Sequence, residues 1–257
     1  MNLHSAQYKL PPRFSLVNLL QLGMAHIIHF DEIDSTNTYL KNNCPQLADG
    51  TVVCADRQTA GRGRFDRKWI SQDGGLYFSV LVKPQRTDFL PNFTQLMAVC
   101  VCTAAEELGA KAWLKWPNDV LANGKKLCGI LSEAVVTSSG IEGVVIGVGV
   151  NVAQENLSHV GQPAISLKEL GINISKQDFL QKVLTLFWRD YPAVVQSGFG
   201  VIRQAYEQRF PYIGKQISVK NGAAPVSGTV KGVSPRGTLL LNTAQGPEEI
   251  YIGDLIV

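Results

Sequence analysis

Apolar residues between positions 26 and 152 fall in short runs that predict strands separated by a few helices. Residues 76–82 are apolar on both faces, which indicates a strand that is buried on both sides. An Asn-Gly pair at 123–124 has the signature of a tight hairpin turn. The predicted strands cover residues 27–30, 51–55, 76–82, 113–116, 127–136 and 143–152.

Four stretches carry the spacing or the end signals of helices. Residues 34–37, Asp-Ser-Thr-Asn, offer N-cap side chains for a short helix that ends near residue 43. Residues 92–108 predict a helix that Gly109 stops. Ser175 and Asp178 resemble a capping box, and apolar residues follow at helical spacing to about residue 196. A further helix is predicted at 199–208.

The pattern changes after Pro211 to short strands and tight turns. Strands are predicted at 216–220, 226–232, 239–242 and 249–255, with turns at Asn221-Gly222 and 235–237. A segment of roughly 45 residues with this pattern is typical of a small all-β barrel. The prediction is therefore an α+β fold, in which a mixed β-sheet flanked by helices is followed by a small barrel.

The predicted domains are an N-terminal extension at 1–25, a main domain at 26–210 and the barrel at 211–257. The extension holds one apolar stretch, at 14–22, that could be a helix. It lacks the charged and apolar regions of a secretory signal, and no apolar run in the chain reaches the length of a membrane span. We therefore expect a cytoplasmic protein without a membrane partner.

Composition narrows the class further. The 257 residues are 45% hydrophobic and 18% charged, which is ordinary for a globular protein. Five cysteines form an odd set without a Cys-x-x-Cys pair and indicate reduced, mostly buried thiols. The four histidines have no zinc-ligand spacing.

Positive charge is concentrated in residues 57–69, which we call the clamp loop. Its first twelve residues hold five basic side chains and one acid, whereas the net charge of the whole chain is only +3. Gly61 and Gly63 allow a sharp bend or a close approach to a ligand, and arginine suits carboxylates and phosphates. The clamp loop predicts a cover over a small anion. A solvated loop or a nucleic-acid contact are the alternatives.

Two further motifs offer polar groups beside predicted strands. Pro117-Asn118-Asp119 is either a turn or a site where Asp119 holds Mg²⁺ or a nucleotide hydroxyl. Lys126 stands at the rim of an apolar strand, and Gly129 within that strand suggests that a ligand or backbone approaches closely. Residues 124–126 lack the upstream glycine and the Ser/Thr of a Walker phosphate loop.

Uncharged polar side chains form a third group. Ser35, Thr36, Asn37 and Gln58 could hold a neutral urea or amide ring, although 35–37 could equally cap a helix. Residues 147–151, Gly-Val-Gly-Val-Asn, are only weak evidence of a dinucleotide site, because no helix follows and the third glycine is missing.

These motifs, taken in order, resemble those of the biotin–protein ligases, over about residues 26–152. The matching segments are 35–37, Gln58, 61–64, Arg67, Trp69, 115–119, Lys126, 129–131 and the glycine-rich strand that ends at Asn151. The resemblance implies the class II synthetase-like biotin/lipoate ligase fold with an SH3-like C-terminal barrel. It also implies a two-step reaction, in which ATP activates biotin as biotinyl-5′-AMP and a lysine of biotin carboxyl carrier protein then receives it.

The resemblance assigns roles to the residues. Arg64 and Lys126 would be catalytic, and Mg²⁺ would accompany ATP, with Asp119 a possible ligand. The residues implied for biotin are Ser35, Thr36, Asn37, Gln58, Arg62, Gly63, Arg64, Lys126 and Gly129. Those implied for ATP or the adenylate are Arg64, Arg67, Trp69, Asn118, Asp119 and Asn151.

The chain departs from the family in two places. The family's clamp loop runs Gly-Arg-Gly-Arg-Arg-Gly-Arg, but Phe65-Asp66 replaces the second Arg-Gly here, which puts the closing rate of the loop in doubt. Only about 25 residues precede the catalytic segment, so we expect a ligase without a DNA-binding repressor domain. The family implies a monomer or a homodimer. A lipoate or octanoate enzyme of the same superfamily and a non-enzymatic nucleic-acid-binding protein are the rival functions.

Overall fold

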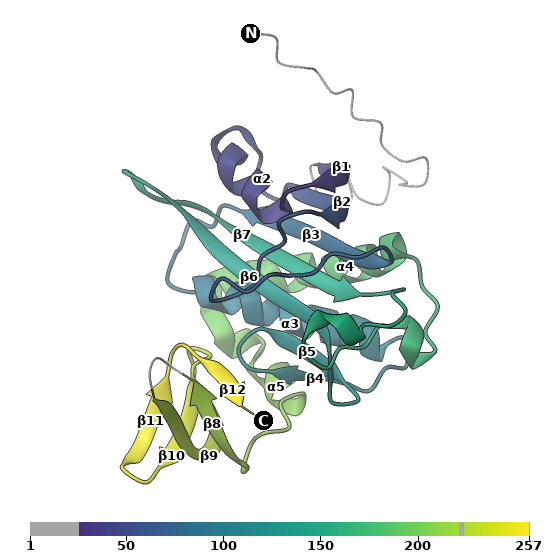
Figure 1. The fold of residues 1–257 in the computed structure, drawn as a ribbon. Coiled ribbons are helices and arrows are strands. Elements are labelled where there is room, and N and C mark those ends of the chain that lie inside the picture. The colour runs from purple at the N-terminus through teal and green to yellow at the C-terminus, as the bar shows by residue number, and fades with distance from the viewer. Residues whose placement is uncertain (1–25, 221–223, 257) are drawn as a thin grey trace.

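The computed structural model describes residues 26–220 and 224–256, which form a large α+β domain and a smaller β domain (Figure 1). The expected apolar helix at 14–22 and the Asn221-Gly222 turn lie outside the described residues. Within the described part of the chain, no helix is long and apolar enough to cross a membrane.

The large domain is built on a seven-stranded sheet of order β1-β2-β3-β7-β6-β5-β4. β1 and β2 are parallel and the other neighbours are antiparallel, so the predicted mixed sheet is confirmed. Its strands are β1 (Ile27–Ile33), β2 (Val52–Gln58), β3 (Gly75–Val82), β4 (Ala112–Lys115), β5 (Asp119–Ala122), β6 (Lys125–Thr137) and β7 (Gly140–Asn151). Its helices are α2 (Thr36–Asn43), η1 (Cys44–Gln46), α3 (Leu90–Glu106), η2 (Ser158–Val160), η3 (Lys168–Leu170), α4 (Lys176–Ser197), η4 (Gly198–Val201) and α5 (Arg203–Gln208).

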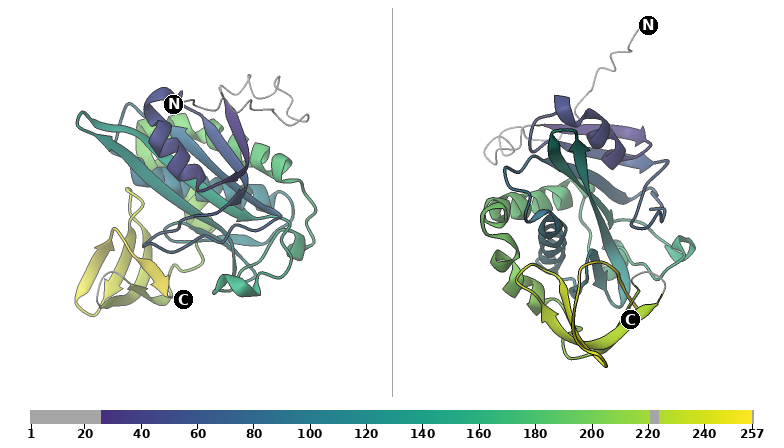
Figure 2. Two further views of the ribbon diagram at one scale, coloured as in Figure 1. Left: turned by 45° about the horizontal axis from the view of Figure 1, so that its top comes forward. Right: turned by 90° about the vertical axis from the view of Figure 1, so that its left-hand side faces the viewer.

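Strand alternation sorts apolar side chains to the two faces of the sheet. Val52 and Cys54 of β2 belong to the large core under α3 and α4, whereas Val53 packs with Leu40 of α2 in a small second core. Figure 2 shows α3 and α4 together on one side of the sheet. All residues of β3 are buried, as the double-faced apolar pattern predicted. The face that carries α2 is the one left open for a site.

The C-terminal domain is a five-stranded antiparallel sheet of order β11-β10-β9-β8-β12. Its strands are β8 (Gln216–Lys220), β9 (Pro225–Val233), β10 (Leu239–Thr243), β11 (Gly246–Ile250) and β12 (Asp254–Ile256). The small all-β domain expected from the turn pattern is therefore present. β12 borders β8 and lies beside the large domain (Figure 1).

Two elements that were predicted to be continuous are each interrupted in the structure. The strand expected at 249–255 is interrupted, because Gly253 has a φ of 150° and separates β11 from β12. The helix expected at 199–208 is split into the 3-10 turn η4 and the short helix α5. Gly198, with a φ of 70°, ends α4 in a conformation that glycine adopts without strain.

The helix ends and the thiols follow the sequence more closely. Ser175 caps α4, and its Oγ accepts a hydrogen bond of 3.0 Å from the Asp178 backbone N–H. The five cysteines are all buried and none is in a disulfide, which agrees with the expected reduced thiols.

Candidate functional site

A cleft of about 690 Å³ opens on the α2 face of the sheet, between the clamp loop, β6, β7 and the C-terminal domain. It gathers segments that are far apart in the sequence. The predicted residues that line it are Ser35, Thr36, Asn37, Gln58, Arg62, Gly63, Arg64, Arg67, Trp69, Asn118, Asp119, Lys126 and Gly129.

One end of the cleft is polar but uncharged, at the N-terminus of α2. Ser35 is the N-cap residue, and Thr36 donates to Gln58 Oε1 from its backbone N–H at 2.9 Å and from its hydroxyl at 3.1 Å. The Oγ atoms of Thr36 and Ser79 lie 2.6 Å apart. The helix-cap interpretation is confirmed for Ser35, and the same turn lines the cleft. We call this part, Ser35, Thr36, Asn37 and Gln58, the ring end.

Glycines of β6 and β7 form the floor and explain the Gly-x-Gly pattern. A Cβ atom on Gly147 would stand 2.1 Å from Asn37 Oδ1, and one on Gly149 would stand 2.4 Å from Trp69 Cε2. Gly129 is similarly covered by the Trp69 ring, at 2.8 Å. These distances are far below van der Waals contact, so the strands need glycine to let α2 and the clamp loop approach.

The clamp loop is a narrow hairpin. Gly63 N–H donates to Arg67 O at 2.7 Å, and Trp69 N–H donates to Gly61 O at 2.9 Å. Phe65 and Asp66, at its tip, have φ values of 55° and 57°. This left-handed pair closes the hairpin, although the conformation is uncommon for a bulky residue such as phenylalanine. The Phe65 ring is exposed and lies 4.7 Å from the Arg64 guanidinium carbon.

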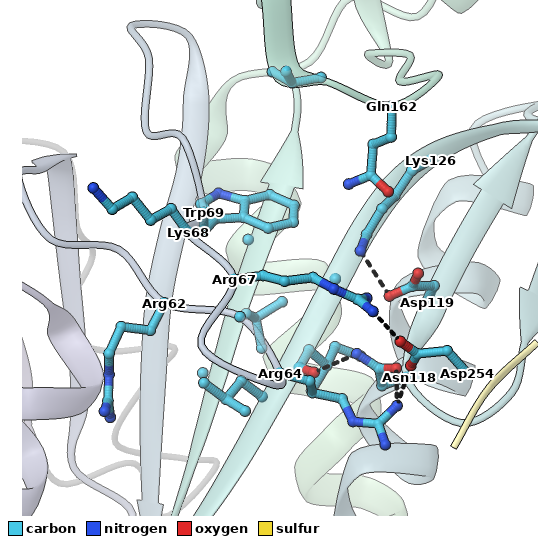
Figure 3. Close-up of a pocket in the computed structure, with 18 of the residues that line it drawn as sticks. Arg62, Arg64, Arg67, Lys68, Trp69, Asn118, Asp119, Lys126, Gln162 and Asp254 are labelled. Atoms are coloured by element: carbon cyan, nitrogen blue, oxygen red, sulfur yellow. Dashed lines mark hydrogen bonds and ion pairs between the residues drawn. The ribbon is translucent and has the colours of Figure 1, made fainter. Parts of the chain in front are cut away.

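Arg64 and Arg67 reach across the cleft to the C-terminal domain (Figure 3). Arg64 Nη1 donates to Asp254 Oδ1 at 2.8 Å, to Gly253 O at 3.1 Å and to Asn118 Oδ1 at 3.2 Å. Arg67 forms an ion pair with the other oxygen of Asp254. Burial lowers the pKa of the Arg64 guanidinium, and the Asp254 and Asp119 carboxylates oppose that shift. No pattern in the sequence had indicated Asp254, which closes the cleft on the side of the C-terminal domain.

Lys126 and Asp119 meet at the centre of the cleft. Lys126 Nζ lies 2.9 Å from Asp119 Oδ1 and 5.6 Å from the centroid of the Trp69 ring. Both side chains are largely buried, with exposed fractions of 16% and 18%. The lysine is therefore held between the clamp loop and the strand β5, where its charge can face an anion.

Asn151 is the one predicted residue that does not reach the cleft. Its buried amide donates to Lys126 O and Ile165 O, each at 3.2 Å. It therefore fixes the backbone of Lys126 and of the segment that follows η2. Val160, which ends η2, lines the cleft together with Gly161 and Gln162, and the sequence had not indicated these residues.

Glu133 of β6 is the most connected residue that sequence reasoning missed. Its carboxylate accepts hydrogen bonds from Arg62, Lys41 and Asn37. Gly129 and Leu131 line the cleft from the same face of β6, so the two-residue period of a strand could have placed Glu133 there as well. Lys68, Lys115 and Lys220 also line the cleft and had not been predicted to do so.

The described residues that line the cleft do not form a cage of protein ligands for a metal ion. The carboxylates that line it, Asp119 and Asp254, are each paired with a cation. The one potential metal group among the described residues, His29, Asp31 and Asp56, lies outside the cleft, and Asp56 there pairs with Lys176. Asp119 fits a Mg²⁺ ion that brings most of its oxygen ligands with a nucleotide.

Comparison with known proteins identifies the architecture. The profile of the Biotin/lipoate A/B protein ligase family matches residues 29–151, and that of the Biotin protein ligase C terminal domain matches 212–257. The bifunctional ligase/repressor BirA of Bacillus subtilis is 35% identical over 90% of this chain and 73% of its own length. The biotin–[acetyl-CoA-carboxylase] ligase of Paracoccus denitrificans is 31% identical over 84% of this chain and 94% of its own. The structure of an Aquifex aeolicus biotin protein ligase in complex with biotin and ATP has a TM-score of 0.80 and 32% identity, and the match covers 90% of this chain and 97% of that one.

Proposed function

Since this chain belongs to the biotin protein ligase family, we propose that it activates biotin with ATP and transfers it to a lysine of biotin carboxyl carrier protein. In the first step the biotin carboxylate attacks the α-phosphate of ATP, which gives biotinyl-5′-AMP and pyrophosphate. In the second step the lysine amine of the carrier attacks the acyl carbon and AMP leaves. The enzyme is then a biotin–[acetyl-CoA-carboxylase] ligase, with ATP and biotin as its substrates.

One observation carries the proposal: an uncharged polar pocket and a strongly cationic one open into the same cleft. The ring end offers hydroxyl and amide groups that match a neutral ureido ring. Among the described residues that line the cleft, seven are cationic and two are acidic. The cations are Arg62, Arg64, Arg67, Lys68, Lys115, Lys126 and Lys220, and the acids are Asp119 and Asp254.

Arg64, Arg67 and Lys126 address the main barrier to the first step. Two like charges about 4 Å apart repel by roughly 4 kcal/mol at an effective dielectric constant near 20. A carboxylate therefore approaches a triphosphate only where cations offset the repulsion. Lys126 stands between the clamp loop and Asp119, which suits contact with the biotin carboxylate, and Arg64 and Arg67 suit the phosphates.

Mg²⁺ would enter with the nucleotide and offset further phosphate charge. Asp119 would hold it, with Asn118 beside it as a polar contact to the nucleotide. Trp69 would cover the adenylate and exclude water, because its ring already spans Gly129 and Gly149 on the floor. Asn151 would act behind the cleft through the Lys126 backbone rather than by contact.

The family profile also covers lipoate enzymes, but the biotin-named relatives and the cationic clamp loop favour biotin. The burial of Arg64 against Asp254 argues against a nucleic-acid surface. The test combines the protein, ATP, Mg²⁺ and a purified carrier domain. We expect pyrophosphate release that requires biotin, and biotin on one carrier lysine. Equal turnover with octanoate or lipoate would support a lipoate or octanoate enzyme of the same superfamily. Salt-dependent polynucleotide binding without pyrophosphate release would support a non-enzymatic nucleic-acid-binding protein.

The remaining expectations are proposals as well. We propose a catalytic domain at 26–210, an SH3-like domain at 211–257, cytoplasmic action, no DNA binding, and a monomer or homodimer. Buried free thiols support a reducing compartment. Sedimentation with and without biotin and ATP tests the oligomeric state. A mobility-shift assay with the DNA upstream of the protein's own gene tests the proposed lack of repressor function.

A further inference from the structure

Glu133 joins two parts of the site that belong to different segments. On one side its carboxylate accepts from Arg62 Nη2 at 2.6 and 2.7 Å, and Arg62 belongs to the clamp loop. On the other side it accepts from Asn37 Nδ2 at 2.9 Å and from Lys41 Nζ at 2.7 Å, both in α2. One carboxylate therefore fixes the ring end and the clamp loop to the same point of β6.

The surroundings of Glu133 show that the arrangement is specific. Its side chain is 19% exposed, so its charge depends on these donors rather than on water. Both contacts with Arg62 come from the one nitrogen Nη2, and each carboxylate oxygen also accepts a hydrogen bond from α2, so the carboxylate bridges the two segments through both of its oxygens. In Figure 3 the Arg62 side chain points away from Asp119, Lys126 and Asp254, so this guanidinium is not one of those gathered at the centre of the cleft.

Glu133 also settles the orientation of the Asn37 amide. Asn37 Nδ2 donates to Glu133 and to Leu131 O at 3.1 Å, so both of its hydrogens point at acceptors. The oxygen Oδ1 then faces Ser79 Oγ, at 2.6 Å, over the space that Gly147 leaves open. Loss of the carboxylate would release the amide and the clamp loop together.

We propose that Glu133 is a positioning residue that holds the clamp loop closed over the ring end, so that biotin is retained until the adenylate is used. The retention of biotin rests on the proposed function, whereas the attachment of the clamp loop to Glu133 does not depend on it. Arg62 acts here as the tether of the loop, and its role for biotin lies in placing residues 62–64 rather than in charge neutralisation.

The experiment compares Glu133→Gln with the wild-type protein, because glutamine keeps the shape and removes the charge. We expect the KM for biotin and the rate of biotinyl-5′-AMP release each to rise about tenfold, since a charge-assisted hydrogen bond is lost. The kcat at saturating biotin should change less than twofold. Glu107→Gln, which removes the distant pair with Lys182, is the matched control and should leave all three values unchanged.

A second readout does not need catalysis. Beyond the end of β2 the clamp loop holds four trypsin sites, at Arg62, Arg64, Arg67 and Lys68, and we expect Glu133→Gln to be cut there about tenfold faster than wild type. Arg62→Gln should speed cleavage at the other three sites to the same extent, and the double variant should add nothing, because both remove one pair. If wild type makes no adenylate, the proposed function fails, and proteolysis still decides the tether. Unchanged KM, release and cleavage in both variants, or additive effects, would overturn the inference.

Discussion

At the scale of single residues, burial decides which groups of this protein keep their charge. Arg64 is only 17% exposed, yet Asp254 and two further acceptors compensate its guanidinium. The cysteine thiols are buried without comparable compensation. Burial raises the pKa of Cys54 and of Cys102 to about 12, and it raises the pKa of Cys100 and Cys128 as well. The cationic site is thus available to anions, whereas the thiols are unavailable to electrophiles.

This difference predicts slow thiol chemistry in the native state. A thiol-reactive disulfide reagent at pH 8 should modify less than about one cysteine per chain until the protein unfolds, because the thiolate is the reactive form. All five should react in denaturant. Rapid labelling of several native cysteines at the rate of a free thiol would contradict the burial described here.

Glu133 gives a pH prediction with a definite sign. Partial burial raises its pKa, but hydrogen bonds from Lys41, Asn37 and Arg62 outweigh that, and the pKa lies below the ordinary 4.5. A lowered folded-state pKa stabilises the protein above 4.5, and this contribution is lost as the pH falls through the lowered value. Wild type should therefore exceed Glu133→Gln by about 1 kcal/mol in unfolding free energy at pH 7. Urea titrations should show the difference disappearing below pH 4; a difference that grows in acid would refute the sign.

At the scale of elements, the site exists because α2 and the clamp loop approach strands that lack side chains. Odd-numbered positions of β7 face the cleft side of the sheet, where Gly147 lies under Asn37 of α2 and Gly149 lies under Trp69 of the clamp loop. Even-numbered Val144, Ile146, Val148 and Val150 complete the main core. The strand is therefore a core element on one face and a floor for the cleft on the other.

Gly147→Ala tests this floor. A Cβ atom 2.1 Å from Asn37 Oδ1 must displace the Asn37 amide from its place in the ring end, so we expect biotin affinity to fall at least tenfold and stability to fall by about 1–3 kcal/mol. Calorimetric titration and thermal unfolding measure the two effects. Gly200→Ala is the control, since no atom lies within 4 Å of its added Cβ and it should bind biotin normally. Normal biotin binding by Gly147→Ala would mean that biotin does not need the Asn37 amide in this position.

The same elements show what the sequence could predict. Local patterns were sufficient for β3, for the Ser175 cap and for the Asn123-Gly124 hairpin, where the positive φ angles of both residues match the expected turn. They failed at Phe199, where the 3-10 turn η4 replaces the start of the predicted helix, and at Gly253, which separates β11 from β12. Contacts of Arg62 with Glu133 and of Arg64 with Asp254 join residues 71 and 190 positions apart, and no local pattern predicts such pairs.

At the scale of the whole molecule, the C-terminal domain completes the cleft. Asp254 at the start of β12 binds both Arg64 and Arg67, and Lys220 lines the cleft from the neighbouring strand β8. Trp116 Nε1 and Gln95 Nε2 also donate to Gly237 O, at 3.2 and 2.6 Å. The smaller domain is therefore bonded to the larger one at the cleft and beneath it.

Asp254→Asn should weaken nucleotide binding without unfolding the protein. Removing the carboxylate leaves Arg64 and Arg67 to repel each other, so we expect the KM for ATP to rise about tenfold, while the melting temperature stays within a few degrees of wild type. Initial-rate kinetics with varied ATP give the first value. Glu248→Gln, on β11 of the same domain, should behave as wild type. A lower KM for ATP in Asp254→Asn would show instead that the carboxylate competes with phosphate.

The proposed first step depends on cations that let a carboxylate meet a nucleotide, and isotope exchange between pyrophosphate and ATP measures that step directly. Wild type should exchange label only when biotin is present, and Arg64→Gln should exchange at least about 100-fold more slowly at saturating substrates. Exchange that proceeds without biotin, or at the full wild-type rate in Arg64→Gln, would contradict the central role given to the clamp loop.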